Sequence, residues 1–377
     1  MTDMINSFLS TLPFTVTLTW TVILLIEYKR ARAAGQALFW FALTCCLLYF
    51  AHAVHFLGGK TGATIWIDCL YSFCHLAVYP LFYIYIRLLT EPQKLKPREL
   101  WIIVPAIIVA AAEHVAIALE LSTNIILNIS DVIFLTEIIL TFIFARQKLS
   151  RFNRQIENSY ADTEEKTARP VQTMFYILIF TSLTSATANI IGRDYFIGKV
   201  SLAIPSVLFT ALIFSVLYVG YKQVYDARNL YIDFNVKEGH DIYEDEAEAA
   251  ANDKSEQKAL MERIDRIMVE SLLFCRPGLK VSDLAEIIGS NRTYVSTCIN
   301  KVRGESFSEF INSYRIEYVK RLLSEDNSYT ITEIGTMAGF SSDSSLFRNF
   351  KFSTGLTPKQ WLDNSNNGKC KAPSKGQ

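Results

Sequence analysis

Eight ionisable side chains interrupt strongly apolar stretches in the first part of the sequence. Seven of them are candidate site residues, namely His52, His55, Asp68, His75, Glu113, His114 and Asp131, and the eighth is Glu137. Ionisable groups in such stretches are costly, so they usually face a cavity, pair with one another or bind a ligand. Two roles are open. The residues line a polar pocket that takes a small extracytoplasmic ligand or reports pH, or they form hydrogen bonds that only hold helices together.

Metal and cofactor chemistry have weaker support. His52 and His55 are three residues apart and share a helix face, which suits two metal ligands, but no convincing further ligands accompany them. The seven cysteines have neither zinc-site spacing nor the pattern of a disulfide framework. The sequence also offers no nucleophile and base arranged for catalysis. We therefore expect no metal, no cofactor and no enzyme activity.

The stretches that carry these residues are long enough to span a bilayer, which requires about 20 apolar residues per helix. Seven candidate spans are predicted, at residues 8–26, 37–57, 63–89, 100–119, 125–144, 171–191 and 199–219. Basic residues concentrate in the loops after the first, third and fifth spans, whereas the opposite loops hold only Lys60, Arg193 and Lys199. This bias predicts an N-terminus outside and everything after the seventh span in the cytosol.

The remaining chain is different in composition. We expect a membrane domain over 1–220, an acidic cytosolic linker over 221–257, a folded domain over 258–364 and a polar tail over 365–377. From Lys258 to Gln377 there are 17 Lys and Arg against 13 Asp and Glu, a mildly basic balance that permits nucleic-acid binding. The longest expected cytosolic loop, 145–169, is basic. It is an inert surface loop, or it contacts the linker or lipid headgroups.

Two helix pairs about 50 residues apart are predicted in the C-terminal region. Ser282 and Gly289 are expected to begin and end the first short helix. Thr330 and Glu333 form a capping box at the start of the second pair, and Gly355 closes it. Apolar residues at helical spacing predict the inward faces of both pairs and of two further helices. They are Leu284, Ile287, Ile288, Val295, Ile299, Leu346 and Phe350 for the pairs, Phe307, Phe310, Ile311, Tyr314, Tyr318 and Leu322 between them, and Leu260, Ile264, Ile267 and Leu272 before them.

Two strings make the pattern specific: FSEFINSYRIEYVKRLL, and IGTMAGFSSDSSLFRNFKFSTGLTP with its G-x-T-P ending. With them, residues 260–362 resemble the DNA-binding domain of the AraC/XylS family of transcription regulators. The resemblance covers about 100 of the 377 residues. It implies seven helices, two of which enter successive major grooves of double-stranded DNA. The apolar half does not match that family's usual soluble effector domain, so the resemblance implies no inducing signal.

The family's motif also implies which residues face DNA. The first recognition helix would offer Thr293, Ser296, Thr297 and Asn300, and the second Asp343, Ser344, Phe347 and Arg348, with Lys301, Arg303 and Lys351 on phosphates. Arg348 either pairs with a guanine edge or bridges a phosphate or an acidic neighbour. Asn300 either reads an adenine or caps its helix. Asp343 either accepts from a cytosine amine or orients a neighbour.

Taken together, the sequence predicts an all-α protein with a seven-helix transmembrane bundle and an AraC-type double helix-turn-helix domain. The expected function is that of a one-component transcription regulator in the bacterial cytoplasmic membrane, with a homodimer and a contact to RNA polymerase as further expected partners. The alternatives are a transporter or membrane receptor with an appended regulatory domain, and a C-terminal helix bundle that binds protein instead of DNA.

Overall fold

The computed structural model describes the backbone of residues 2–58, 65–92, 94–191, 203–234, 254–325 and 329–369. Side chains are described for residues 9, 11–54, 66–92, 94–183, 206–234, 254–325 and 329–364. Lys60, Arg193, Lys199 and the acidic run of the expected linker lie outside these ranges. Within them the regular structure is helical, apart from one isolated bridge between Tyr160 and Lys280, which confirms the predicted all-α class.

The chain divides into two compact units. The first comprises Met1–Phe152 and Ala168–Leu230, and the second comprises Asn153–Thr167 and Tyr231–Gln377. The second unit therefore includes a stretch of chain that lies, in sequence, between two helices of the first. We call Asn153–Thr167 the inserted segment.

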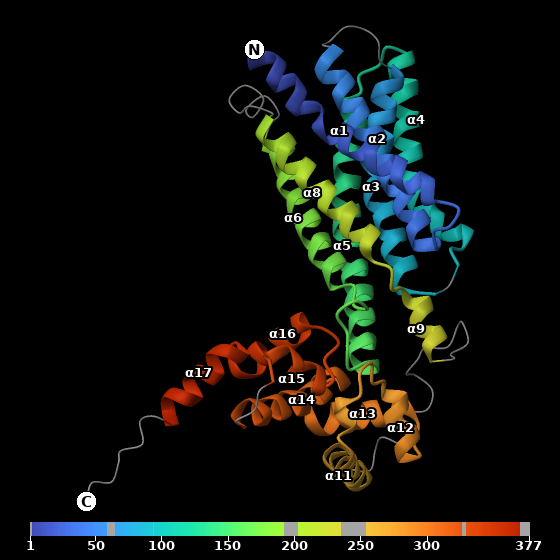
Figure 1. Ribbon diagram of the computed structural model, residues 1–377. Helices are drawn as coiled ribbons and strands as arrows, with labels where there is room; N and C mark the ends of the chain where they lie inside the picture. Colours follow the sequence, from blue (N-terminus) through green and yellow to red (C-terminus); the bar gives the residue numbers. More distant parts are fainter. Residues whose placement is uncertain are drawn as a thin grey trace, which may run out of the picture. The chain divides into compact units, whose positions relative to one another are not determined.

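Seven long helices in the described residues of the first unit coincide with the seven predicted stretches (Figure 1). They are α1 (Thr2–Glu27), α2 (Ala33–Gly58), α3 (Ile65–Thr90), α4 (Val104–Ala118), α5 (Asn124–Ser159), α6 (Arg169–Ile191) and α8 (Ala203–Lys222). A 3-10 helix, η1 (Pro97–Ile103), precedes α4, and a short helix, α9 (Ala227–Asp233), follows α8. Five stretches in the described residues are long and apolar enough to cross a membrane, and Thr11–Glu27 is a shorter apolar helix. Seven crossings therefore stay a prediction.

The first unit keeps much of its apolar surface on the outside. Inside the bundle, α2 packs against α1 and α3, and α8 packs against α1 and α6. The ring of His75 on α3 stacks on Phe134 of α5 at 4.0 Å. Outside, Ile26, Trp66 and Ile125 are 77%, 77% and 72% exposed. Soluble proteins rarely expose large contiguous apolar patches, so this outer surface is typical of helices that contact lipid.

Two ion pairs show which helix ends lie together in the first unit. Arg32, after α1, pairs with Asp226, after α8, at 3.1 Å. Lys148, toward the end of α5, pairs with Glu91, directly after α3. The end of α1 therefore lies beside the end of α8, and the end of α3 lies beside the part of α5 that carries Lys148.

The second unit contains seven α-helices within residues 254–325 and 329–369, as the resemblance implies. They are α11 (Lys254–Ser271), α12 (Val281–Ile288), α13 (Arg292–Arg303), α14 (Phe307–Ser324), α15 (Ile331–Met337), α16 (Asp343–Thr354) and α17 (Pro358–Lys369), with a 3-10 turn, η2 (Leu273–Cys275), after α11. One core joins α11, α12, α13 and the first half of α14, and a second joins the other half of α14 to α15, α16 and α17. The long helix α14 therefore connects two helix pairs, each with its own core.

Most of the predicted helix ends are confirmed. The capping box is present: the Thr330 amide donates to the Glu333 carboxylate at 2.7 Å, and the Glu333 amide donates to the Thr330 hydroxyl at 3.2 Å. The bond from the Thr330 amide, and a second one from the Thr330 hydroxyl at 2.8 Å, lower the pKa of the Glu333 carboxyl. Gly289 and Gly355 end their helices with left-handed φ angles of 67° and 74°.

The predicted N-cap at Ser282 is wrong. Helix α12 begins one residue earlier, at Val281, and Lys280 occupies the N-cap position. The Lys280 amide donates to the Asp283 carboxylate at 3.0 Å. An acidic residue inside the first turn thus supplies the acceptor that we expected from a serine at the cap.

The turn at Gly339 should tolerate no side chain. Its φ is +88°, and an added Cβ would lie 2.5 Å from the backbone oxygen of Cys275. We expect Gly339→Ala to lower the free energy of unfolding by more than about 2 kcal/mol, because backbone strain adds to a backbone clash. The control is Gly304→Ala, with a φ of +72° but nothing within 4 Å of the added Cβ. It should cost only about 1 kcal/mol. Chemical denaturation of the full chain, followed by the fluorescence of Trp361 after the other four tryptophans are replaced by phenylalanine, would measure both. Equal losses would contradict the clash.

Candidate nucleic-acid interface

Local sequence sets the orientation of both expected recognition helices. Helix α13 begins at an Asn291 cap, whose side chain accepts from the Tyr294 amide at 2.7 Å. Its residues Val295 and Ile299 are fully buried. The opposite face of α13, which carries Thr293, Ser296, Thr297 and Asn300, therefore turns away from the core of its helix pair.

Helix α16 is built in the same way. It begins at a Ser342 cap, whose hydroxyl accepts from the Ser345 amide at 3.1 Å. Leu346 and Phe350 are fully buried in the second core. Asp343, Ser344, Phe347, Arg348 and Lys351 are all exposed on the opposite side.

The expected DNA-facing side of α13 is partly covered. Thr293 and Ser296 are only 9% and 1% exposed. The Ser296 hydroxyl donates to the backbone oxygen of Asn158, in the inserted segment, at 3.4 Å. The Asn300 amide group donates to the Ser296 carbonyl at 2.8 Å, one turn back in the same helix. Two of the four residues predicted to read DNA from α13 are therefore buried in this conformation.

Arg303 lies at the exposed end of α13 but is held by an acidic partner. Its guanidinium pairs with Asp265 of α11 at 2.6 Å, and this hydrogen bond raises the pKa of Arg303. The Tyr314 hydroxyl donates to the other Asp265 oxygen at 2.6 Å. Burial and that bond raise the pKa of Tyr314. Arg303 thus helps fasten α13 to α11 and α14, a role that we did not predict.

On α16, the sequence left the roles of Arg348 and Asp343 open, and in the structure each of them contacts another side chain. Arg348 pairs with an acidic neighbour, Glu164, at 2.7 Å. The Asp343 carboxylate accepts from the Thr332 hydroxyl of α15 at 3.1 Å. Both side chains remain exposed to solvent despite these contacts.

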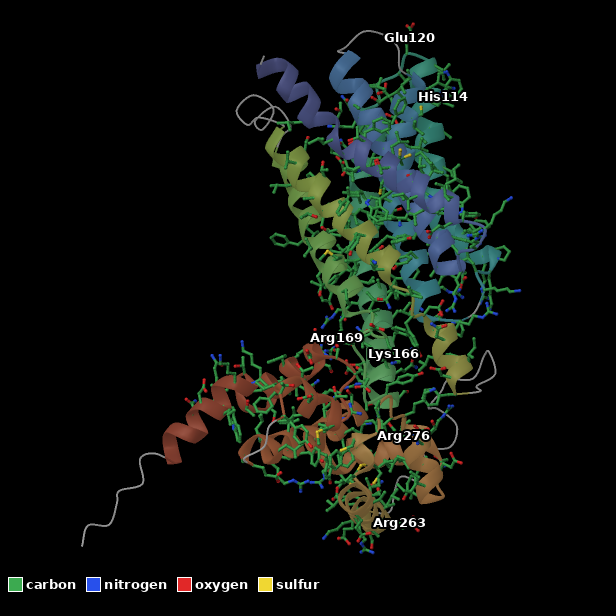
Figure 2. All side chains as sticks on the ribbon, viewed as in Figure 1. His114, Glu120, Lys166, Arg169, Arg263 and Arg276 are labelled. Carbon is green, nitrogen blue, oxygen red and sulfur yellow. The ribbon has the colours of Figure 1, made fainter. Side chains whose placement is uncertain are left out.

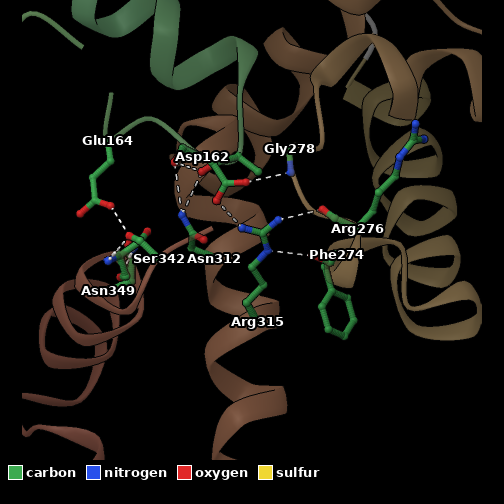
Figure 3. A network of polar contacts seen from close by, with 12 residues as sticks. Asp162, Glu164, Phe274, Arg276, Gly278, Asn312, Arg315, Ser342 and Asn349 are labelled. Carbon is green, nitrogen blue, oxygen red and sulfur yellow. Dashed lines mark hydrogen bonds and ion pairs between the residues drawn. The ribbon is translucent and has the colours of Figure 1, made fainter. Parts of the chain in front are cut away.

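The inserted segment is anchored by a buried ion pair (Figure 3). Asp162 binds the Arg315 guanidinium at 2.8 Å and accepts from the Gly278 amide at 3.0 Å. Arg315 also donates to the backbone oxygens of Phe274 and Arg276, at 2.7 and 3.0 Å. Its burial lowers its pKa, and the nearby Asp162 charge opposes that lowering. A buried pair of this kind is costly to break from one side, by about 3–5 kcal/mol.

Ala161 fixes the backbone of the inserted segment. Its amide donates to the Leu279 oxygen at 3.0 Å. Its own oxygen accepts from Ser308 at 2.9 Å and from Asn312 at 3.3 Å, and its side chain belongs to the first core. The interpretation of 145–169 as an inert surface loop was therefore wrong for this part. The sequence feature that could have indicated a structural role is the acidic run Asp162–Glu165, inside a loop that is otherwise basic.

The expected pocket residues of the first unit are only partly brought together. Glu113 of α4 hydrogen-bonds with Ser72 of α3 and lies close enough to Asp68 to interact with its charge. The His114 ring lies against the Trp66 ring, with centroids 4.9 Å apart and planes tilted by 37°, and His114 lies near the Glu120 end of α4 (Figure 2).

The other predicted residues lie elsewhere in the unit. His75 packs against Phe134, His52 is exposed on α2, Asp131 is partly buried on α5, and the side chain of His55 is not among those described. Within the described residues, no group of three His, Cys, Asp or Glu side chains could hold a metal ion.

Comparison with known proteins gives the second unit a family. Residues 284–364 match a family model described as a helix-turn-helix domain. The C-terminal part of the chain is an AraC-type helix-turn-helix domain. A helix-turn-helix-type transcriptional regulator of Staphylococcus aureus is 39% identical over 83 residues, which is 22% of this chain and 11% of that protein. The regulator YobQ of Bacillus subtilis is 37% identical over 91 residues, 24% of this chain and 36% of YobQ.

These matches cover the helix-turn-helix domain and a minor share of each relative. A protein of unknown function from Listeria innocua aligns with 28% of this chain and 94% of its own at 25% identity. The TM-score of 0.25 is too low to show a shared fold. Residues 284–364 thus resemble the helix-turn-helix domains of transcriptional regulators, and a domain of this kind implies DNA binding.

Two of the three basic side chains predicted to contact phosphate, Arg303 and Lys351, should behave differently. Because Arg303 is held by Asp265, we expect Arg303→Ala to leave the salt dependence of duplex binding nearly unchanged. Lys351→Ala should reduce the slope of log K against log salt by about 1, the loss of one phosphate contact. Titrating a duplex into the full chain in lipid nanodiscs at several salt concentrations would measure both slopes. A loss for Arg303→Ala as large as that for Lys351→Ala would show that Arg303 leaves Asp265 to bind phosphate.

Proposed function

We propose that the chain is a membrane-bound one-component transcription regulator. Its helix-turn-helix domain binds specific DNA in the cytosol, and its helical bundle is both anchor and sensor. The observation that carries the proposal is the combination, on one polypeptide, of an AraC-type helix-turn-helix domain with apolar helices whose outer side chains are exposed. A soluble regulator does not need that outer surface, and transport by itself does not need that domain.

DNA reading would use both helix pairs. Helices α13 and α16 carry the residues that turn away from the two cores, and α14 connects the pairs, so that each recognition helix can enter a major groove of the same duplex. Arg348 is the side chain best suited to a base, because a guanidinium can donate two hydrogen bonds to a guanine edge. A second copy of the chain at a paired half-site, and RNA polymerase beside it, would be the protein partners.

Sensing would use the polar groups of α3 and α4. Asp68, Ser72 and Glu113 are neighbours within an apolar bundle, and one oxygen of Glu113 is buried without a hydrogen-bond partner. The Nδ1 atom of His114 is also buried without a hydrogen-bond partner. A small polar extracytoplasmic ligand could satisfy such atoms and change how α3 packs on α4. The same groups can also serve only to hold these helices together.

Sequence-specific binding would test the proposed function. We expect Arg348→Ala to weaken binding to the preferred duplex by about 1–3 kcal/mol and to relax the base preference at one position. The control is Arg263→Ala, which removes the same charge from an exposed position on α11 (Figure 2). Selection of duplexes from a random pool by the full chain in nanodiscs, followed by titration, gives both readouts. Binding without any base preference, or no binding at low salt, would favour a receptor or transporter whose C-terminal domain has another partner.

The location of the domain can be tested separately. If the loops after α1, α3 and α5 are cytosolic, protease added to intact spheroplasts should leave an epitope after Gln377 uncut, and lysis should expose it. The basic residues of those loops underlie this expectation. A tag inserted within residues 59–64 is the opposite control and should be cut in intact cells. Cleavage of the C-terminal epitope before lysis would exclude regulation of chromosomal genes by the tethered domain.

A further inference from the structure

Glu164 occupies the place on α16 that a DNA phosphate or base edge would take. One of its oxygens accepts from Arg348 at 2.7 Å, and the other accepts from the Ser342 hydroxyl at 2.5 Å. Ser342 is the N-cap of α16, so the carboxylate lies at the positive end of the helix. Arginine together with a helix N-terminus is a common way to bind a phosphate.

The same segment covers the other recognition helix. The Asn158 oxygen accepts from Ser296, and Ser296 and Thr293 are nearly inaccessible to solvent. Asn158 and Glu164 are only six residues apart, yet they contact both of the helices that are expected to enter DNA. A duplex cannot contact Ser296 while Asn158 is in place, nor pair fully with Arg348 while Glu164 holds it.

The inserted segment is held in a built site. Asp162 pairs with the fully buried Arg315 and accepts from the Gly278 amide, while Ala161 bonds to Leu279, Ser308 and Asn312. Tyr160 is 2% exposed, and its hydroxyl donates to Asp233 at 2.6 Å. Every one of these contacts lies within the second unit.

We propose that the inserted segment is an intramolecular competitor of DNA that keeps the helix-turn-helix domain closed until it is displaced. The inference rests on the proposed function, because it assigns a regulatory device to the DNA-binding surface. Glu164 stands in for a phosphate on α16, Asn158 blocks α13, and Asp162 is the anchor. Each molecule thus divides between a closed state with the segment bound and an open state that accepts a duplex.

The route from signal to segment is a single helix. Helix α5 (Asn124–Ser159) contains one of the candidate membrane spans and ends inside the inserted segment, one residue after Asn158. A helix transmits rotation and translation along its axis, so a change in the packing of α5 would move Asn158 relative to Ser296. The segment continues through Thr167 to α6, which begins at Arg169. It is therefore attached at one end to a candidate span and at the other to the helix that corresponds to the predicted span 171–191.

The first test compares two neighbouring carboxylates. Glu164→Gln removes the charge that pairs with Arg348, and Glu165→Gln removes the same charge from the exposed next residue. The probe is a random-sequence duplex of about 30 base pairs, long enough for two successive major grooves. With the full chain in nanodiscs at low salt, we expect Glu164→Gln to bind about five- to tenfold more tightly than the wild type, because a larger fraction of molecules is open. Glu165→Gln should stay within about twofold. Equal tightening by both variants would mean general electrostatics and would overturn the proposal.

The second test uses the unmodified chain and needs no variant to fold. Amide hydrogen exchange of residues 158–164 should be slow without DNA, because the Ala161 amide is bonded to Leu279. Saturating duplex should speed it at least tenfold, since bound DNA excludes the segment. Duplex binding with unchanged protection would overturn the competitor while leaving the proposed function standing. Absence of duplex binding by the wild type and by Glu164→Gln would instead contradict DNA binding itself, and the competitor with it.

Discussion

The guanidinium of Arg315 has five N–H groups, and it lies completely buried in the middle of α14. Two backbone oxygens, of Phe274 and Arg276, satisfy the side that faces η2, and Asp162 supplies both an acceptor and the countercharge. A buried charge without such a partner would cost several kcal/mol. The helix-turn-helix domain is therefore electrostatically complete only when it holds a carboxylate from a distant part of the sequence, and water must take that place whenever the segment leaves.

The two acidic contacts of the inserted segment differ in character. Asp162 is 6% exposed and is protected from salt, so it gives the segment its affinity. Glu164 and Arg348 have side chains 23% and 52% exposed, where ion pairs contribute little to stability and are readily exchanged. A strong anchor beside a weak surface pair lets the outer contact open first. With this order of opening, an incoming phosphate can replace the Glu164 carboxylate at Arg348 before the buried pair of Asp162 and Arg315 is disturbed.

The sequence alone predicted the features that depend on residues close together in the chain, and it missed those that depend on residues far apart. Local signals worked: the Thr330 and Glu333 capping box, the glycines that end helices, and the apolar spacing of Val295, Ile299, Leu346 and Phe350 all predicted the helices and their inward faces. The predicted N-cap at Ser282 was wrong because the next residue, Asp283, supplies the capping acceptor instead. Asp162 and Arg315 are 153 residues apart, and no periodicity connects them. The partners of Arg303 and Glu164 were missed for the same reason, since each pairing depends on how separate helices pack.

The inserted segment and the surface that it covers belong to the same polypeptide. A tethered competitor acts at an effective concentration set by the chain that connects it, on the order of millimolar for a short flexible connection, and not by the number of molecules in the cell. The closed fraction is then the same in a cell with few copies and in one with many. Raising expression would increase the number of DNA-binding domains in proportion, but it would not change the closed fraction. Each copy would therefore have its own threshold for opening.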